Sequence, residues 1–192
     1  MSDYTALPDG LPAPIDDGAA DELVGSPLPD LALPSTLGGE LSLADVGARL
    51  LVAYVYPMTG TPGRALPEGW DDIPGARGCT PQSCAYRDAL GQFRELGADL
   101  VGISAQSPAA QAEFAGREHI PYPLLADDGL RLVEALGLPT FEAEGRTFYR
   151  RLTLIAAAGR IVKVFYPVFP PDRDAAAVLA WLGGGTDPRV AR

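Results

Sequence analysis

The 192-residue sequence has few of the residues that bind metals or form permanent cross-links: two cysteines and one histidine. A structural zinc site needs about four nitrogen or sulfur ligands, and His119 stands far along the chain from Cys79 and Cys84. We therefore expect no metal site. A single domain of this length also buries its core without disulfide staples, so the two cysteines need another explanation.

Basic residues and long apolar runs are scarce as well. The 15 Lys and Arg against 25 Asp and Glu give a net charge of −10, and such a surface repels nucleic acid and anionic membranes. The start of the chain shows no secretory signal pattern, and nowhere do about 18 apolar residues run together as a membrane span requires. We expect a cytoplasmic protein, where a cysteine pair is more often catalytic, redox-sensing or metal-binding than structural.

The order of apolar patterns predicts one α/β domain over residues 25–185. Residues 1–24 are predicted to be a flexible N-terminal extension or a tail lying on the body, and residues 186–192 a C-terminal tail. Strands and helices alternate in a way that predicts a mixed central sheet with helices on both faces. The expected elements are a hairpin around Gly38-Gly39, strands at 49–57 and 99–104, helices from 79 to 96, 108–117, 127–137 and 172–184, and two strands within 150–167.

A long stretch rich in glycine and proline, residues 58–78, separates the first buried strand from the first long helix. Its composition predicts a loop. A loop of this length inside a domain is uncommon unless it has a function. Trp70 lies in it, and the loop is expected either to pack down on the body or to form a lid.

Both cysteines fall on the helix that follows this loop. Pro81 is tolerated only in the first helical turn, which places the helix start near Cys79. Five positions along a regular helix put the two Cα atoms about 8 to 9 Å apart. A disulfide cannot close when the Cα atoms are more than roughly 7 Å apart unless the backbone moves. A disulfide between Cys79 and Cys84 therefore requires the first turn to unwind. The positive end of a helix also favours a thiolate, so Cys79 is the better nucleophile and Cys84 the natural second thiol.

The strand "LLVAYVYP", the motif "GCTPQSCAYRD" and the later "LGADLVGISAQSPAAQAEFA" resemble the peroxiredoxins of the AhpC/TSA family, in the bacterioferritin comigratory protein or PrxQ group. The resemblance runs from about residue 26 to residue 182. It implies a thioredoxin-like fold and a thiol peroxidase that reduces hydrogen peroxide and organic hydroperoxides. Cys79 would be the peroxidatic cysteine and Cys84 the resolving cysteine of an intramolecular disulfide. The resemblance implies that no cofactor or metal is needed and that the partner is thioredoxin or a similar dithiol. We expect a monomer or weak dimer.

The family also holds peroxide with a Pro-x-x-x-Thr-x-x-Cys stretch and a distant arginine. Here Pro57 and Thr61 fit, but Arg64 stands where the cysteine belongs, and residues 64–78 intervene. Thr61 sits beside the thiolate if that segment loops out; otherwise Thr80 or the inserted backbone takes its place. The family's arginine precedes a late strand.

The sequence offers two candidates for that arginine, Arg150 and Arg151, and their spacing to Thr153 favours Arg151. Only one of two neighbours on a strand can face the site. Two other functions stay open, the first of them because the threonine motif is disturbed. One is a thiol-disulfide oxidoreductase on the same fold, and the other is a non-enzymatic redox sensor.

Overall fold

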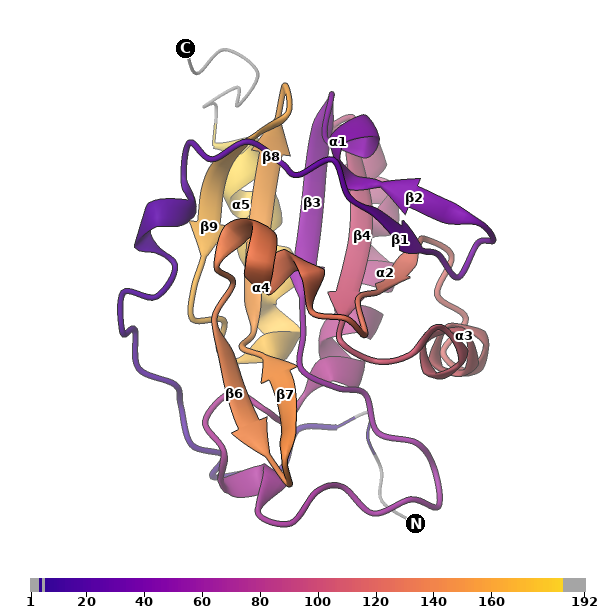
Figure 1. Ribbon diagram of the computed structural model, residues 1–192, viewed down its shortest axis with the longest axis vertical. Coiled ribbons are helices and arrows are strands. Elements are labelled where there is room, and N and C mark those ends of the chain that lie inside the picture. Colours follow the sequence, from indigo (N-terminus) through magenta and orange to yellow (C-terminus); the bar gives the residue numbers. More distant parts are fainter. Residues whose placement is uncertain (1–3, 5, 185–192) are drawn as a thin grey trace.

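The computed structural model describes residues 4 and 6–184. A five-stranded mixed sheet lies at the centre of the domain (Figure 1). The predicted tail at 186–192 lies outside the described residues. β3 is parallel to β4 and β4 to β5, whereas β8 runs antiparallel to both β3 and β9. The sheet order is β5 (Leu124–Ala126), β4 (Ala98–Ser104), β3 (Leu50–Val55), β8 (Leu152–Ala157) and β9 (Arg160–Phe165). The predicted mixed α/β fold is confirmed.

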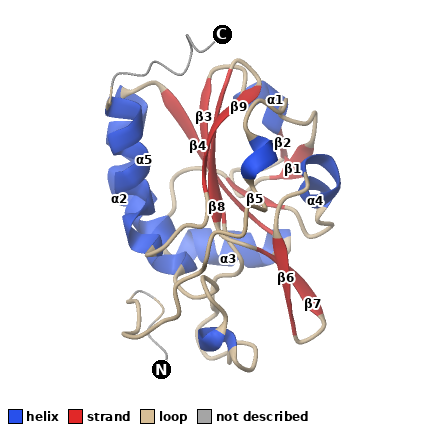
Figure 2. Ribbon diagram, turned by 90° about the vertical axis from the view of Figure 1, so that its left-hand side faces the viewer, coloured by secondary structure: helices blue, strands red, loops and turns tan. Residues whose placement is uncertain are grey.

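Every residue of the central strand β3 is buried. Leu51, Ala53 and Val55 enter one core cluster and Leu50, Val52 and Tyr54 the other, because successive side chains of a strand point to opposite faces. Figure 2 shows α2 and α5 on one side of the sheet and α4 with the hairpin β1–β2 on the other. The bounds are α1 Leu43–Val46, α2 Cys79–Glu95, α3 Pro108–Arg117, α4 Arg131–Leu136, α5 Asp174–Gly183, β1 Ala32–Pro34 and β2 Glu40–Ser42.

Local signals explain most helix starts. The Ser107 side chain accepts a hydrogen bond from the backbone of Ala110, and Pro108 is the first residue of α3, as expected for a serine cap. The helix expected from residue 127 begins only at Arg131. The reason is that the buried Asp127 side chain accepts from the backbone N–H groups of Arg131 and Leu132 at 2.9 and 3.0 Å, so Asp127 caps the helix instead of joining it.

Three strands were missing from the sequence prediction: β5 and the hairpin of β6 (Thr140–Ala143) and β7 (Arg146–Tyr149). The hairpin supports the loop 58–78. Trp70, in a short 3-10 turn (Trp70–Asp72), is buried against Phe148 and Phe141, with ring centroids 4.9 and 5.7 Å away. The loop therefore has a small apolar core of its own, separate from the two cores of the sheet.

The N-terminal segment lies along the body of the domain, and a 3-10 turn at Asp21–Leu23 buries Leu23. The Tyr4 hydroxyl donates to the carbonyl of Arg64 at 2.9 Å, and the Arg77 guanidinium lies 5.2 Å from the centre of the Tyr4 ring. Further along, the Tyr166 hydroxyl donates to Asp17 at 2.8 Å. Among the described residues no helix is both long and apolar enough to cross a membrane.

Candidate active site

Cys79 is the first residue of α2, and its side chain is 2% exposed. The chain enters the helix through Gly78, whose φ of 102° places it in the left-handed region. A Cβ at this position would lie 2.4 Å from the side chain of Pro171, so glycine is required here by both conformation and space. The tight entry lets the loop turn directly into the helix and places the thiol at its positive end.

Arg151 reaches the same point from the start of β8. Its Nη2 lies 3.2 Å from Cys79 Sγ and also donates to the carbonyls of Gly75, Ala76 and Arg77 at 3.1 to 3.2 Å. Arg151 is buried, at 3% exposure. Arg150, its neighbour, instead turns outward and pairs with Asp17 at 3.8 Å. Of the two candidate arginines, the structure therefore brings Arg151 to the thiol.

A buried polar chain fixes the far side of the Arg151 guanidinium. Nη1 donates to Gln82 Oε1, and Gln82 Nε2 in turn donates to the Asp174 carboxylate at 2.8 Å. Tyr86 and Thr153 hydroxyls donate to the same carboxylate oxygen at 2.8 and 2.7 Å. Burial raises the pKa of Asp174, and the three hydrogen bonds oppose that shift. The sequence analysis did not identify Gln82 and Asp174, although it predicted the two helices in whose first turns they lie.

The space next to Cys79 is small, about 10 Å³, enough for roughly one water molecule. Of the described residues, those lining it with Cys79 are Tyr4, Met58, Gly60, Leu66, Trp70, Arg77, Gly78 and Thr80. Thr61 is not among them and lines a neighbouring cavity of about 850 Å³ instead. Thr59 is buried and donates its backbone N–H to Gln106 at 2.8 Å. The inserted loop thus contributes Trp70 and the carbonyls of residues 75–77 to the site.

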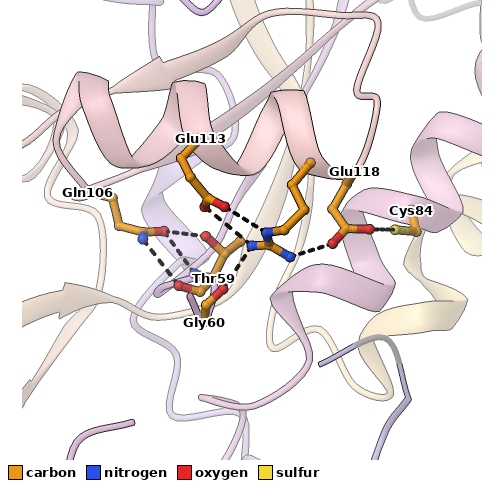
Figure 3. A network of polar contacts seen from close by, with 7 residues as sticks. Thr59, Gly60, Cys84, Gln106, Glu113 and Glu118 are labelled. Atoms are coloured by element: carbon orange, nitrogen blue, oxygen red, sulfur yellow. Dashed lines mark hydrogen bonds and ion pairs between the residues drawn. The ribbon is translucent and has the colours of Figure 1, made fainter. Parts of the chain in front are cut away.

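Cys84 lies on the same helix, half-buried, and both thiols are free. Its Sγ donates to Glu118 Oε2 at 3.8 Å, a contact that Figure 3 shows within a larger network that reaches Gly60. Burial raises the pKa of the Cys84 thiol; the Arg87 guanidinium opposes this shift, and the Glu118 and Asp88 carboxylates add to it. Nothing in the sequence pattern indicated the contact with Glu118.

Comparison with known proteins agrees with this arrangement. The profile of the Redoxin family matches residues 23–179. The chain belongs to the redoxin family. Within it, peroxiredoxin Bcp of Bacillus subtilis is 30% identical over 159 residues, which cover 81% of this chain and 92% of that protein. The expected family, the peroxiredoxins of the Bcp/Q group, is confirmed.

Two further relatives place this redoxin in the same group. Chloroplastic peroxiredoxin Q of Gentiana triflora is 28% identical over 158 residues, covering 82% of this chain but only 65% of the longer plant protein. The crystal structure of peroxidoxin BcpB from Mycobacterium tuberculosis superposes with a TM-score of 0.67 at 27% identity, covering 83% of this chain and 95% of that one. The thioredoxin-like fold expected from the resemblance is thereby confirmed.

Proposed function

We propose that this redoxin is a thiol peroxidase in which Cys79 attacks hydrogen peroxide or an organic hydroperoxide. The observation that carries the proposal is the buried Arg151 guanidinium 3.2 Å from Cys79 Sγ at the first residue of α2. A cation and a helix N-terminus both stabilise the thiolate that reacts. The Cys79 sulfur bonds to one peroxide oxygen, the O–O bond breaks, and the other oxygen leaves as water or alcohol with the thiol proton, giving a sulfenic acid.

In the proposed cycle Cys84 is the resolving cysteine. Its sulfur attacks the Cys79 sulfur, the S–S bond forms, the S–O bond breaks, and the hydroxyl group leaves as water with the proton of Cys84. The first turn of α2 must unwind for this step. A thioredoxin-type dithiol then reduces the disulfide by exchange. The proposal includes the cytoplasm as the place of action and a monomer or weak dimer as the working state.

Thr61 keeps a subordinate place in the proposal. It follows Gly60, which lines the Cys79 space, and it lines the neighbouring cavity together with Met58 and Gly60; this supports a contact with a peroxide that enters from that cavity. Thr80, which lines that space directly and is 2% exposed, is the alternative hydroxyl. Thr61→Val and Thr80→Val distinguish the two by the loss in the rate of peroxide reaction.

Rapid-mixing kinetics test the main proposal. The reduced protein should consume hydrogen peroxide far faster than a free thiol, and Cys79→Ser should abolish this reaction. Cys84→Ser should keep the fast first step and accumulate a sulfenic acid on Cys79 that dimedone traps. If Cys79 and Cys84 form a disulfide but the protein does not consume peroxide in the steady state with a thioredoxin system present, the result would instead indicate a redox sensor. Unchanged turnover in Cys84→Ser would overturn the role of Cys84.

A further inference from the structure

Glu118 is the carboxylate that accepts a hydrogen bond from the thiol of Cys84, and no step of the proposed cycle yet uses it. Its Oε2 accepts from Cys84 Sγ at 3.8 Å, and its side chain is 13% exposed. The two residues are 34 positions apart, so the contact exists only because the C-terminal end of α3 folds back on the second turn of α2. Figure 3 shows the sulfur of Cys84 directed at this carboxylate.

The Glu118 carboxylate is held firmly in place. Arg117 Nη1 pairs with its second oxygen, Oε1, at 2.5 Å, and Arg87 Nη1 donates to the Glu118 backbone carbonyl at 2.7 Å. Arg117 also donates through Nη2 to the carbonyl of Gly60 at 3.0 Å. Since Gly60 lines the space beside Cys79, one network connects the surroundings of both thiols.

The other groups around Cys84 cannot play the same part. Tyr54 of β3 and Tyr122 face it from the sheet side, but burial raises the pKa of both phenols well above their usual range, so both stay neutral. Asp88 on α2 pairs with Arg87 at 2.8 Å; its carboxylate raises the pKa of the Cys84 thiol and the Arg87 guanidinium lowers it, but neither makes a hydrogen bond to the sulfur. Glu118 alone combines a negative charge with a hydrogen bond to the sulfur.

We propose that Glu118 is a positioning residue that keeps Cys84 docked as a protonated thiol until Cys79 has been oxidised. This inference rests on the proposed function, in which Cys84 is the resolving cysteine. A carboxylate beside a thiol disfavours the thiolate, and the thiolate is the form that peroxide oxidises. Glu118 thereby directs peroxide to Cys79 and spares Cys84 for the later attack. When α2 unwinds at its start and Cys84 moves to the Cys79 sulfur, Cys84 leaves the carboxylate and this restraint ends.

The test uses the full chain with Cys79→Ser, which leaves Cys84 as its single thiol. The rate of alkylation of Cys84 by iodoacetamide is measured from pH 6 to pH 10, with and without Glu118→Gln. Glutamine keeps an oxygen acceptor but removes the charge, so the rate profile should move to lower pH and alkylation at pH 7.5 should accelerate about threefold to tenfold. Glu118→Asp, which keeps the charge, should restore a profile near that of the parent.

Glu113→Gln is the matched control. Glu113 pairs with the same Arg117 at 2.8 Å but makes no contact with Cys84 among the described residues, so its loss should leave the profile unchanged. Equal profiles for the two glutamine variants would overturn the proposal, as would an Asp variant that behaves like Gln. Alkylation needs no peroxide, so a failure of the proposed peroxidase activity is a separate result, seen as absent peroxide consumption in the parent chain.

Discussion

Cys79 and Cys84 lie on one helix, yet the charged side chains that form hydrogen bonds with their sulfurs have opposite signs. Cys79, at the first residue of α2, contacts the buried guanidinium of Arg151 at 3.2 Å. Cys84, little more than a turn later, contacts the carboxylate of Glu118. A nearby cation favours a thiolate and a nearby carboxylate disfavours it. The same helix thus carries one thiol beside a cation and one beside a carboxylate, which in the proposed cycle are the peroxidatic and the resolving cysteine.

Arg151 and Glu118 come from distant parts of the chain. This explains how two cysteines only five residues apart can contact groups of opposite charge. Arg151 arrives at the start of β8, beside the central strand β3. Glu118 arrives at the end of α3, next to the other flank of α2. The sheet order brings these segments to α2 from two sides. The difference between the thiols is therefore a property of the fold, not of the motif that contains them.

The largest expected effect comes from removing the cation. Arg151→Met should lower the second-order rate constant for the reaction of Cys79 with hydrogen peroxide by about a hundredfold or more, comparable to the loss of a key electrostatic donor in an active site. Arg151→Lys should recover only part of this rate, because lysine cannot contact the thiol, Gln82 and the loop carbonyls together. Stopped-flow measurement of peroxide consumption gives this rate constant for the wild type and for the Met and Lys variants.

Arg150→Met provides the control for this prediction. Arg150 is the neighbouring residue, with its side chain 40% exposed and paired with Asp17. Its loss should change the rate constant less than about twofold, as expected for an exposed pair. A larger loss in Arg150→Met than in Arg151→Met would show that the geometry at Cys79 differs during the reaction and would remove the basis of the comparison.

A smaller effect is expected from the inserted loop. Trp70→Ala removes a buried aromatic ring that packs on Phe141 and Phe148, and such truncations cost about 3 to 5 kcal/mol. The loosened loop also carries the three carbonyls that hold Arg151, so the peroxide rate constant of Cys79 should fall about tenfold, as small misplacements do. Urea unfolding and stopped-flow kinetics measure the two losses separately.

Trp181→Ala serves as the comparison for the loop variant. Trp181 is half-buried near the end of α5 and packs against the main core, away from the loop. It should lower stability while leaving the rate constant of the folded protein within about twofold. If both tryptophan variants lower the rate constant equally, the loop has no particular role in holding Arg151.

The sequence predicted the parts of this site that follow from local pattern. The buried run of β3 and Pro81 in the first turn of α2 each depend on residues that are near in the chain, whereas Arg151 was proposed from the family resemblance and its spacing to Thr153. The hairpin β6–β7 was missed because its strands are four residues each and carry charged residues around the turn at Glu144-Gly145. Short, partly exposed strands lack the clean alternation that identifies longer ones.

Contacts between segments that are distant in the chain could not be predicted from the local sequence pattern. Asp174 stands between Arg173 and a run of alanines and has the pattern of a solvated helix start, yet it is 3% exposed and accepts from three donors. Glu118 likewise has the pattern of an exposed residue at a helix end. Their burial depends on how α5 and α3 pack against α2, and no local signal encodes that packing.

The smallest expected effect concerns Asp174, the carboxylate on the Cys79 side. Gln82 stands between it and Arg151, so unlike Glu118 it touches no thiol. Burial raises its pKa in the folded state; its contribution to stability is thus fully present below the unfolded-state value of about 3.9 and is lost as the pH rises through the folded-state pKa. Asparagine does not titrate. The unfolding free energy of the wild type minus that of Asp174→Asn should therefore be larger at pH 4.5 than at pH 8.

Urea unfolding at both pH values measures this difference, which amounts to about 1.4 kcal/mol for each unit by which folding raises the pKa. Asp172→Asn, an exposed carboxyl on the preceding turn, should change the unfolding free energy by less than about 0.5 kcal/mol at either pH. A difference that instead grew with rising pH would mean that the folded protein favours the ionised Asp174. The site at Cys79 would then hold a full negative charge two contacts from the thiol, which would oppose the effect of Arg151 and weaken the contrast with Cys84.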